Sequence, residues 1–154
     1  MELQVELRMV LDVVIAGVLG GLVGLDRERK EKPAGLRTHT IIGAASCLVT
    51  LLGLALITMH ESSAVAKPDP VRIIQSIVIG ISFLGTGTII GNEKLHRVEG
   101  LTTAASILLT AAVGIAVGIH LYVVAVCVTL LDLFVLAWVM KIEAAVGTKR
   151  GDRD

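Results

Sequence analysis

The residues that could do chemistry are concentrated in one charged segment, GLDRERKEKPAGLRTHT, residues 24–40. Asp26 and Glu28 place two carboxylates close together, and Mg²⁺ prefers carboxylate oxygens together with retained water. Alternatively, Glu28 forms an ion pair with Arg37, because a Pro and a Gly between them turn the chain back on itself. We favour the ion pair and keep the cation site as the alternative.

A second candidate is Asp132, a single acid within the apolar stretch Leu121–Met140. It stands about eight residues, or ~12 Å along a helix, from the end of that stretch. An acid at this depth in a membrane is a functional hypothesis by default, with ion transport or proton coupling as examples. The alternative is a structural Asp that is hydrogen-bonded to hydroxyls such as those of Thr110 or Thr129. Both interpretations stay open.

The elements that must position these residues are five long apolar stretches. Hydrophobic residues make up 54% of the 154-residue chain, and charged residues only 18%. The stretches are Met9–Leu25, Ile41–Met59, Ile73–Gly91, Leu101–Ile119 and Leu121–Met140. Each approaches the ~20 residues that cross a bilayer as a helix, and none shows the alternation of a barrel strand. The sequence predicts an all-α, polytopic membrane bundle of five helices over residues 1–140, with a short polar tail over 141–154.

Basic residues indicate the orientation, because cytoplasmic loops carry an excess of Lys and Arg. Eleven of the 14 lie in the first loop, the third loop and the tail: Arg27, Arg29, Lys30, Lys32, Arg37, Lys94, Arg97, Lys141, Lys149, Arg150 and Arg153. The opposite side has Arg8, Lys67 and Arg72. We therefore predict an external N-terminus and a cytoplasmic C-terminus.

Small residues predict how the helices pack. Gly17, Gly20, Gly21 and Gly24 repeat at a spacing that lets helix backbones approach closely, within one chain or between two copies. In the third stretch, residues 80–88 hold three Gly and two Thr. They indicate either close packing, with Thr bonding back to its own helix, or a broken helix that forms part of a site.

Two polar positions near the predicted outer face complete the set. Asp12 can meet Arg8, four residues earlier on the same helical face, and we expect a structural pair there. Gly118-Ile119-His120-Leu121 is expected to form a tight turn between the last two helices, with His120 at the interface.

The predicted topology brings three separate segments to the cytoplasmic face. The residues expected to form one cluster there are Arg27, Glu28, Arg37, His39, Gly85, Gly87, Thr88, Thr102 and Thr103. The hydroxyl of Ser106 enters the fourth stretch from the same side. A site that opens to the cytoplasm is the simplest inference.

Three blocks in order resemble the MgtC/SapB family: GLDRERKEKPAGLRTHTIIGAAS, DPVRIIQSIVIGISFLGTGTII and VEGLTTAASILLTAAVGIAVGIHLY. The resemblance covers roughly residues 10–138. It implies a bacterial inner-membrane protein associated with growth or virulence at low magnesium. For virulence-type members it implies regulation, including restraint of the F-type ATP synthase, and some members are described as magnesium transport proteins.

The chain also departs from the family pattern. Virulence-type MgtC proteins carry a further soluble domain, and this chain, which stops at Asp154, is similar to the shorter SapB type. Asp26 stands where Glu is expected, and Ser82 where Gly is expected. Ile107 and Leu108 stand where an aromatic residue is common. None of these differences removes a charged group.

The functional expectation is a non-enzymatic membrane regulator, with a divalent-cation transporter as the alternative. The sequence has no nucleophile–base pair, no HExxH spacing and no Gly-rich loop between a strand and a helix, so we expect no enzyme and no cofactor. The basic loop suits anionic lipid headgroups better than nucleic acid. The expected partners are the lipid bilayer, another membrane complex or a second copy, and the identity of any metal stays unknown.

Overall fold

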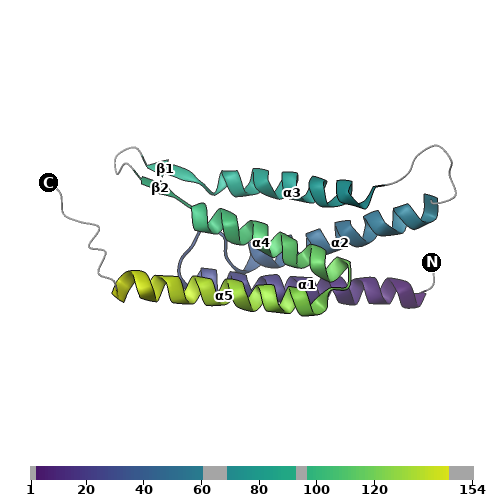
Figure 1. Cartoon of the computed structure of the whole chain (residues 1–154), viewed down its shortest axis with the longest axis horizontal. Helices are drawn as coiled ribbons and strands as arrows, with labels where there is room; N and C mark the ends of the chain where they lie inside the picture. The colour runs from purple at the N-terminus through teal and green to yellow at the C-terminus, as the bar shows by residue number, and fades with distance from the viewer. Residues whose placement is uncertain (1–2, 61–68, 93–96, 146–154) are drawn as a thin grey trace.

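Five helices run back and forth along one long axis (Figure 1). They are α1 (Leu3–Arg29), α2 (Leu36–His60), α3 (Pro70–Gly87), α4 (Leu101–Gly118) and α5 (Tyr122–Ala145). The structure is a computed structural model that describes residues 3–60, 69–92 and 97–145. The predicted all-α class with five helices is confirmed. A small antiparallel ribbon of β1 (Ile90–Asn92) and β2 (Arg97–Glu99) precedes α4 and was not expected.

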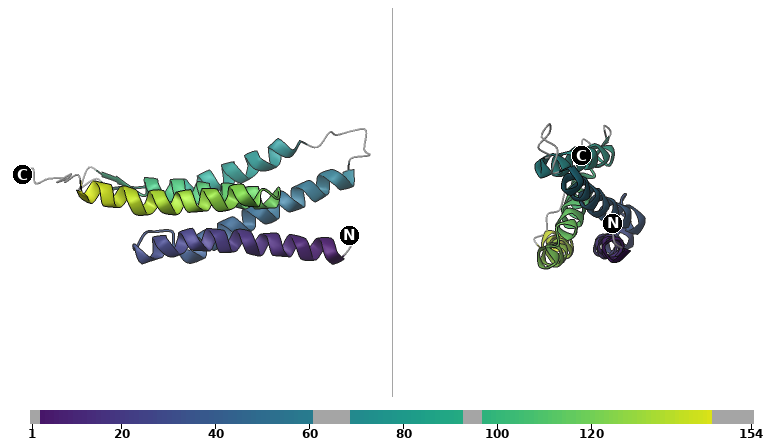
Figure 2. Two further views of the ribbon diagram at one scale, coloured as in Figure 1. Left: turned by 60° about the horizontal axis from the view of Figure 1, so that its bottom comes forward. Right: turned by 90° about the vertical axis from the view of Figure 1, so that its right-hand side faces the viewer.

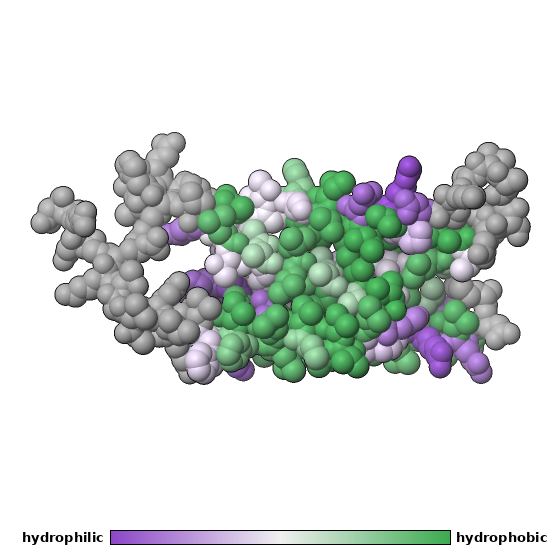
Figure 3. Space-filling model, viewed as in Figure 1, coloured by the Kyte–Doolittle hydropathy of each residue, from purple (hydrophilic) through white to green (hydrophobic). Residues whose placement is uncertain are grey.

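The surface is that of a protein surrounded by lipid. Among the described residues, α1 to α4 are long and apolar enough to cross a membrane, and α5 carries a shorter apolar stretch, Tyr122–Trp138. Hydrophobic side chains dominate the middle of the face shown in Figure 3, and hydrophilic ones gather toward its ends. Large apolar side chains point outward, including Phe83 at 80% exposure and Val123 at 77%. A continuous apolar surface of this kind needs a membrane or partner to cover it.

The alternating helix directions create a basic end of the bundle, made of the α1–α2 turn, the β1–β2 ribbon and the C-terminal end of α5 (Figure 1). The N-terminus and the α4–α5 turn lie at the opposite end. This arrangement agrees with the alternation that the basic residues predicted. Which end faces the cytoplasm stays a prediction.

Helix boundaries differ from the expected ones in all of α1, α2, α3 and α5. α1 continues through the charged residues to Arg29, because Arg, Glu and Lys are good helix formers. α2 begins at Leu36, which makes Arg37 and His39 helical. α3 ends at Gly87, before the expected Gly91, while α5 extends to Ala145. The rest of the predicted tail, 146–154, lies outside the described residues.

Local chemistry explains where the helices start and stop. Asp69 caps α3 by accepting a 2.9 Å hydrogen bond from the N–H of Val71. The tight α4–α5 turn is present, with His120 in the left-handed region at φ 61° and Leu121 N donating to Ala116 O at 2.8 Å. This is the hydrogen-bond pattern of a Schellman helix end. Gly100, at φ 90°, precedes α4 where a Cβ would collide with Thr88 O.

α2 packs closely on both α1 and α4, and α1 and α4 also contact each other. A Cβ on Gly43 would lie 2.5 Å from Ala16 O of α1, and one on Gly114 of α4 would collide with Gly43 O. α3 packs against α4 and α2, whereas α5 packs against α4 and α1. The three central helices therefore approach each other through glycine contacts, as expected for helices packed in lipid.

The glycines and threonines of α3 fit the packing interpretation. α3 is continuous from Pro70 to Gly87, so the broken-helix alternative does not hold. Thr86 Oγ1 donates to Ser82 O and Thr88 Oγ1 donates to Gly85 O, each at 2.8 Å. Both threonines thus bond back to their own helix end.

Candidate functional site

A row of three hydroxyls on α4 forms the centre of the buried polar cluster. Thr103, Ser106 and Thr110 recur at a spacing of three and four residues, which places them on one helical face. They are 2%, 3% and 1% exposed. Each hydroxyl meets a titratable side chain from a different helix. We call these three residues the α4 hydroxyl row.

Arg27, in the last turn of α1, reaches the first hydroxyl. Its Nη2 donates a 2.6 Å hydrogen bond to Thr103 Oγ1, and the residue is only 3% exposed. Its Nε is buried and has no hydrogen-bond partner among the described residues. The carboxylates of Asp132 and Asp26 lie near enough to attract the guanidinium. A buried cation needs such compensation, because desolvating a charge is costly.

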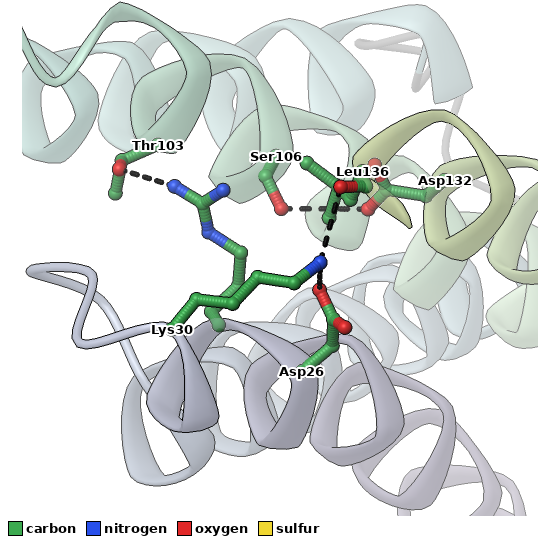
Figure 4. Close-up of polar contacts among 7 residues, drawn as sticks. Asp26, Lys30, Thr103, Ser106, Asp132 and Leu136 are labelled. Atoms are coloured by element: carbon green, nitrogen blue, oxygen red, sulfur yellow. Dashed lines mark hydrogen bonds and ion pairs between the residues drawn. The ribbon is translucent and has the colours of Figure 1, made fainter. Parts of the chain in front are cut away.

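Asp132 of α5 meets the second hydroxyl. Ser106 Oγ donates to Asp132 Oδ2 over 3.4 Å, and Asp132 is 6% exposed (Figure 4). This contact is longer than the usual 2.5–3.0 Å of a hydroxyl hydrogen bond, so the carboxylate is weakly bonded. The expected structural partners were Thr110 or Thr129, and the structure corrects this. Thr129 Oγ1 bonds instead to Ala125 O at 2.8 Å.

His39 of α2 meets the third hydroxyl and is completely buried. Its Nδ1 lies 2.8 Å from Thr110 Oγ1, which itself donates to Ser106 O at 2.9 Å. Since the Thr110 hydroxyl has one proton and gives it to Ser106 O, His39 Nδ1 must be the donor. Neutral His39 then carries an acceptor at Nε2, which is buried and has no partner in the part of the chain that the structure describes.

Lys30 links α1 to α5 near the buried polar cluster. Its Nζ lies 2.7 Å from Asp26 Oδ2 and 3.0 Å from Leu136 O (Figure 4). Asp26 thereby forms an ion pair with Lys30, which directly follows α1. The cation site of Asp26 and Glu28 loses support, because Lys30 already neutralises one of the two carboxylates.

Glu28 has a different role from the one expected. Its Oε2 accepts a 2.7 Å hydrogen bond from Leu36 N, so the carboxylate caps the N-terminus of α2. A negative group at this position also complements the helix dipole. Arg37 is exposed and forms no ion pair with Glu28 in the described part of the chain. The predicted Glu28–Arg37 pair is therefore wrong.

The remaining cluster residues lie on another side of the bundle. Gly85 faces Ala104 of α4 at 3.5 Å from an added Cβ, whereas a Cβ on Gly87 would meet no atom within 4 Å. Thr88 is partly buried and Thr102 is exposed. Seen end-on, α3 lies across the α2–α4 pair from α1 (Figure 2). The expected single cluster is thus divided, and α3 does not join Arg27 and His39.

The four glycines of α1 lie at the contact with α2. An added Cβ would collide with His39 O at Gly20, and would lie 2.7 Å from Gly35 O at Gly24. At Gly21 it would lie 2.9 Å from Thr40 Oγ1, and at Gly17 3.6 Å from Ala44 Cβ. The close approach at Gly20 and Gly24 is what brings Arg27 and His39 to the α4 hydroxyl row.

At the opposite end, a smaller polar cluster joins α1 to the α4–α5 turn. Asp12 is 4% exposed, accepts a 2.8 Å hydrogen bond from Tyr122 OH and lies 3.4 Å from His120 Nδ1. Arg8 is exposed and forms no ion pair with Asp12 within the described residues. The expected Arg8–Asp12 pair is therefore corrected to a Tyr122–Asp12–His120 cluster.

Sequence reasoning missed Ser106 as the Asp132 partner, Thr110 as the His39 partner, and Lys30. The regular spacing of the α4 hydroxyl row within an apolar stretch was the available signal. It indicates a polar helical face that must meet something polar.

The chain is similar in sequence to a known protein family. The model of the MgtC family matches residues 13–145, which include the α4 hydroxyl row and the side chains that contact it. The chain belongs to the MgtC family. No solved structure matches it.

Three curated relatives illustrate the match. The Escherichia coli protein named "Putative magnesium transporter YhiD" is 34% identical over 130 residues, covering 82% of this chain and 58% of that protein. SapB of Bacillus subtilis is 33% identical, covering 74% of this chain and 49% of SapB. MgtC of Brucella abortus is 37% identical, covering 67% and 39%. The chain spans about half the length of the curated relatives it matches.

Proposed function

We propose that this MgtC family chain is a non-enzymatic regulator of the bacterial inner membrane that acts when magnesium is limiting. It works by docking its helices onto another membrane complex, such as the F-type ATP synthase. The lipid bilayer is its medium, and it uses neither a cofactor nor nucleic acid. The N-terminus lies outside and the C-terminus in the cytoplasm, with the basic end at the inner face.

The observation that carries this proposal is the buried cation between α1 and α4 near the basic end of the bundle. Arg27 is 3% exposed and shares the α4 hydroxyl row with Asp132. A dication at Asp132 would be repelled by this guanidinium. Mg²⁺ also needs several converging oxygens, and the described residues contain no group of three or more His, Cys, Asp or Glu that could hold a metal. The polar cluster therefore serves helix assembly better than ion passage.

The outer faces of α5 and α3 give the regulator surfaces for docking. On α5, Phe134 and Trp138 stack at a centroid distance of 5.3 Å and are both more than half exposed. On α3, Ile79 is 71% exposed and Phe83 is 80% exposed. Aromatic anchors of this kind are common energetic centres of interfaces.

Transport of a divalent cation is the second candidate, and the long Ser106–Asp132 contact favours it. At 3.4 Å this hydrogen bond leaves the buried carboxylate with unused acceptor capacity. The name of the relative YhiD points the same way. The Arg27 side chain would have to move away from Asp132 before a dication could bind to that carboxylate.

Two measurements on the purified protein separate the candidates. Magnesium flux into liposomes is recorded with an entrapped indicator for the unaltered chain and for Asp132→Asn. In parallel, tagged protein is isolated from native membranes grown at low magnesium, beside a Phe134→Ala/Trp138→Ala variant. The regulator proposal expects no flux and a stoichiometric membrane complex that the aromatic variant loses. Flux that disappears with Asp132→Asn would overturn it in favour of transport.

A further inference from the structure

An apolar groove runs along the outside of the α1–α2 pair. Its volume is about 520 Å³. Residues of both helices line it, among them Val14, Val18, Leu22, Leu25, Thr40 and Ala44. Valine and leucine side chains form the walls, and those of Val14, Val18 and Leu22 are 55%, 58% and 47% exposed. The groove is therefore open to the surroundings of the bundle and separate from the buried α4 hydroxyl row.

The length of the groove matches one leaflet of a bilayer. Val14 and Leu25 are eleven positions apart on α1, which is about 16 Å along a helix. Half of a typical hydrocarbon core is about 15 Å. A partner transmembrane helix would run along the full core of about 30 Å, so the groove fits an acyl chain better than a helix.

Two exposed arginines lie at the end of the groove that is at the basic end of the bundle. Arg29 follows the lining residue Leu25 by four positions, and Arg37 precedes Thr40 by three, so both continue the groove faces of their helices. Both are exposed, and neither forms an ion pair in the described part of the chain. The neighbouring carboxylate of Glu28 is occupied by the N–H of Leu36.

From this arrangement we propose that the α1–α2 groove binds one anionic phospholipid. Its acyl chain lies along the groove, and its phosphate contacts Arg29 and Arg37. The apolar lining holds the hydrocarbon chain. The two guanidiniums match the geometry of the phosphate oxygens, and their positive charge favours a lipid of net negative charge over a zwitterionic one. By the positive-inside rule, the lipid belongs to the cytoplasmic leaflet.

The test compares lipid binding by the purified full chain with phosphatidylglycerol and phosphatidylethanolamine of identical acyl chains. Native mass spectrometry of protein released from micelles measures the bound fraction during titration with each lipid. The headgroup variant is Arg29→Gln/Arg37→Gln, with Arg72→Gln at the opposite end as its control. The groove variant is Ala44→Leu, with Ala45→Leu as its control, because Ala45 is exposed and does not line the groove. Elution volume and helical circular dichroism confirm that each variant is folded.

The unaltered chain is expected to bind one phosphatidylglycerol more tightly than phosphatidylethanolamine. The double arginine variant should lose roughly 25-fold in affinity for phosphatidylglycerol, since each basic side chain at an anionic surface contributes about fivefold. Ala44→Leu should weaken the binding of both lipids several-fold, and both controls should bind normally. Equal affinity for the two headgroups, or normal binding by Ala44→Leu, would overturn the proposal. A dimer that Ala44→Leu dissociates would also overturn it, because the groove would then be an interface between two copies.

Discussion

The guanidinium of Arg27 donates a 2.6 Å hydrogen bond to the hydroxyl of Thr103 across 76 positions of the sequence. This contact fixes the end of α1 against the start of α4. Asp132 reaches the same face of α4 through Ser106, so a cation and an anion enter one buried layer from different helices. The basic end of the bundle is thereby held together by side chains of opposite charge that share a row of hydroxyls.

Replacing Thr103 should show that its buried hydrogen bond to Arg27 stabilises the fold, whereas an exposed hydroxyl does not. We expect Thr103→Val to lower the free energy of unfolding by about 1.5–3 kcal/mol, because it removes a hydrogen bond to a buried charge. The neighbouring Thr102→Val is the matched control, since Thr102 is exposed and surface substitutions usually change stability by less than about 0.5 kcal/mol. Equilibrium unfolding in mixed micelles measures both. Equal losses for the two variants would contradict the assignment.

Replacing Arg27 should show that the buried carboxylate of Asp132 depends on the positive charge of Arg27. Arg27→Met removes the positive charge that attracts the buried carboxylate of Asp132. Breaking a buried ion pair typically costs about 3–5 kcal/mol, and we expect a smaller loss here, because Arg27 and Asp132 form no direct salt bridge among the described residues. The double variant Arg27→Met/Asp132→Leu should regain most of the folded yield, because no charge remains buried. Yield of monodisperse protein and unfolding midpoints of the two single variants and the double variant give the coupling. Additive losses would show that the two charges act independently.

Two glycines on α1 should differ sharply in their tolerance of a methyl group. At Gly20 a Cβ would collide with His39 O, so Gly20→Ala should cost about 1–3 kcal/mol through overpacking. At Gly17 the nearest atom to an added Cβ is 3.6 Å away. Gly17→Ala should therefore be neutral or stabilising by up to about 1 kcal/mol, because Ala is the better helix former. Thermal unfolding of both proteins makes the comparison, and a stable Gly20→Ala protein would show that α1 and α2 are farther apart.

The orientation can be checked by labelling single cysteines after Cys47 and Cys127 have been replaced by Ala. A cysteine at position 32, in the α1–α2 turn, should react with a membrane-impermeant maleimide only after the cells are permeabilised. A cysteine at position 62, between α2 and α3, should react in intact cells. The reason is the concentration of basic residues at one end of the bundle. The opposite labelling pattern would reverse the proposed topology.

The fold could be predicted from the sequence because long apolar runs leave the backbone only one way to satisfy its hydrogen bonds in lipid. The five helices and the tight turn at His120 followed from this constraint and from local turn chemistry. The β1–β2 ribbon could not be predicted, since its strands are three residues each and lie next to a charged loop. Such short pairs carry no periodic signal.

The residues of the site were harder to predict from the sequence, because they depend on how each helix is rotated about its axis. From the sequence, Arg27 is one of several charges expected at the surface. In the structure it lies on the same helical face as Gly20 and Gly24 and is buried with them. Asp132 was recognised from its type alone, but its partner Ser106 depends on the register between α4 and α5. Glu28 was assigned to an ion pair with Arg37 because the sequence did not show that α2 begins at Leu36. Only that start leaves the Leu36 N–H free to donate to the Glu28 side chain.

The role of Glu28 can be resolved by three substitutions at the α1–α2 turn. If the Glu28 side chain caps α2 through Leu36 N, Glu28→Gln should fold nearly as well as the unaltered chain, because the amide oxygen also accepts a hydrogen bond. Glu28→Ala should lose about 1 kcal/mol, the usual cost of removing a helix cap. Arg37→Ala should leave the folded yield unchanged, because Arg37 is exposed and has no acidic partner in the described residues. Unfolding midpoints of the three proteins provide the measurement. A loss for Arg37→Ala that equals the loss for both Glu28 variants would restore the ion pair and remove the cap.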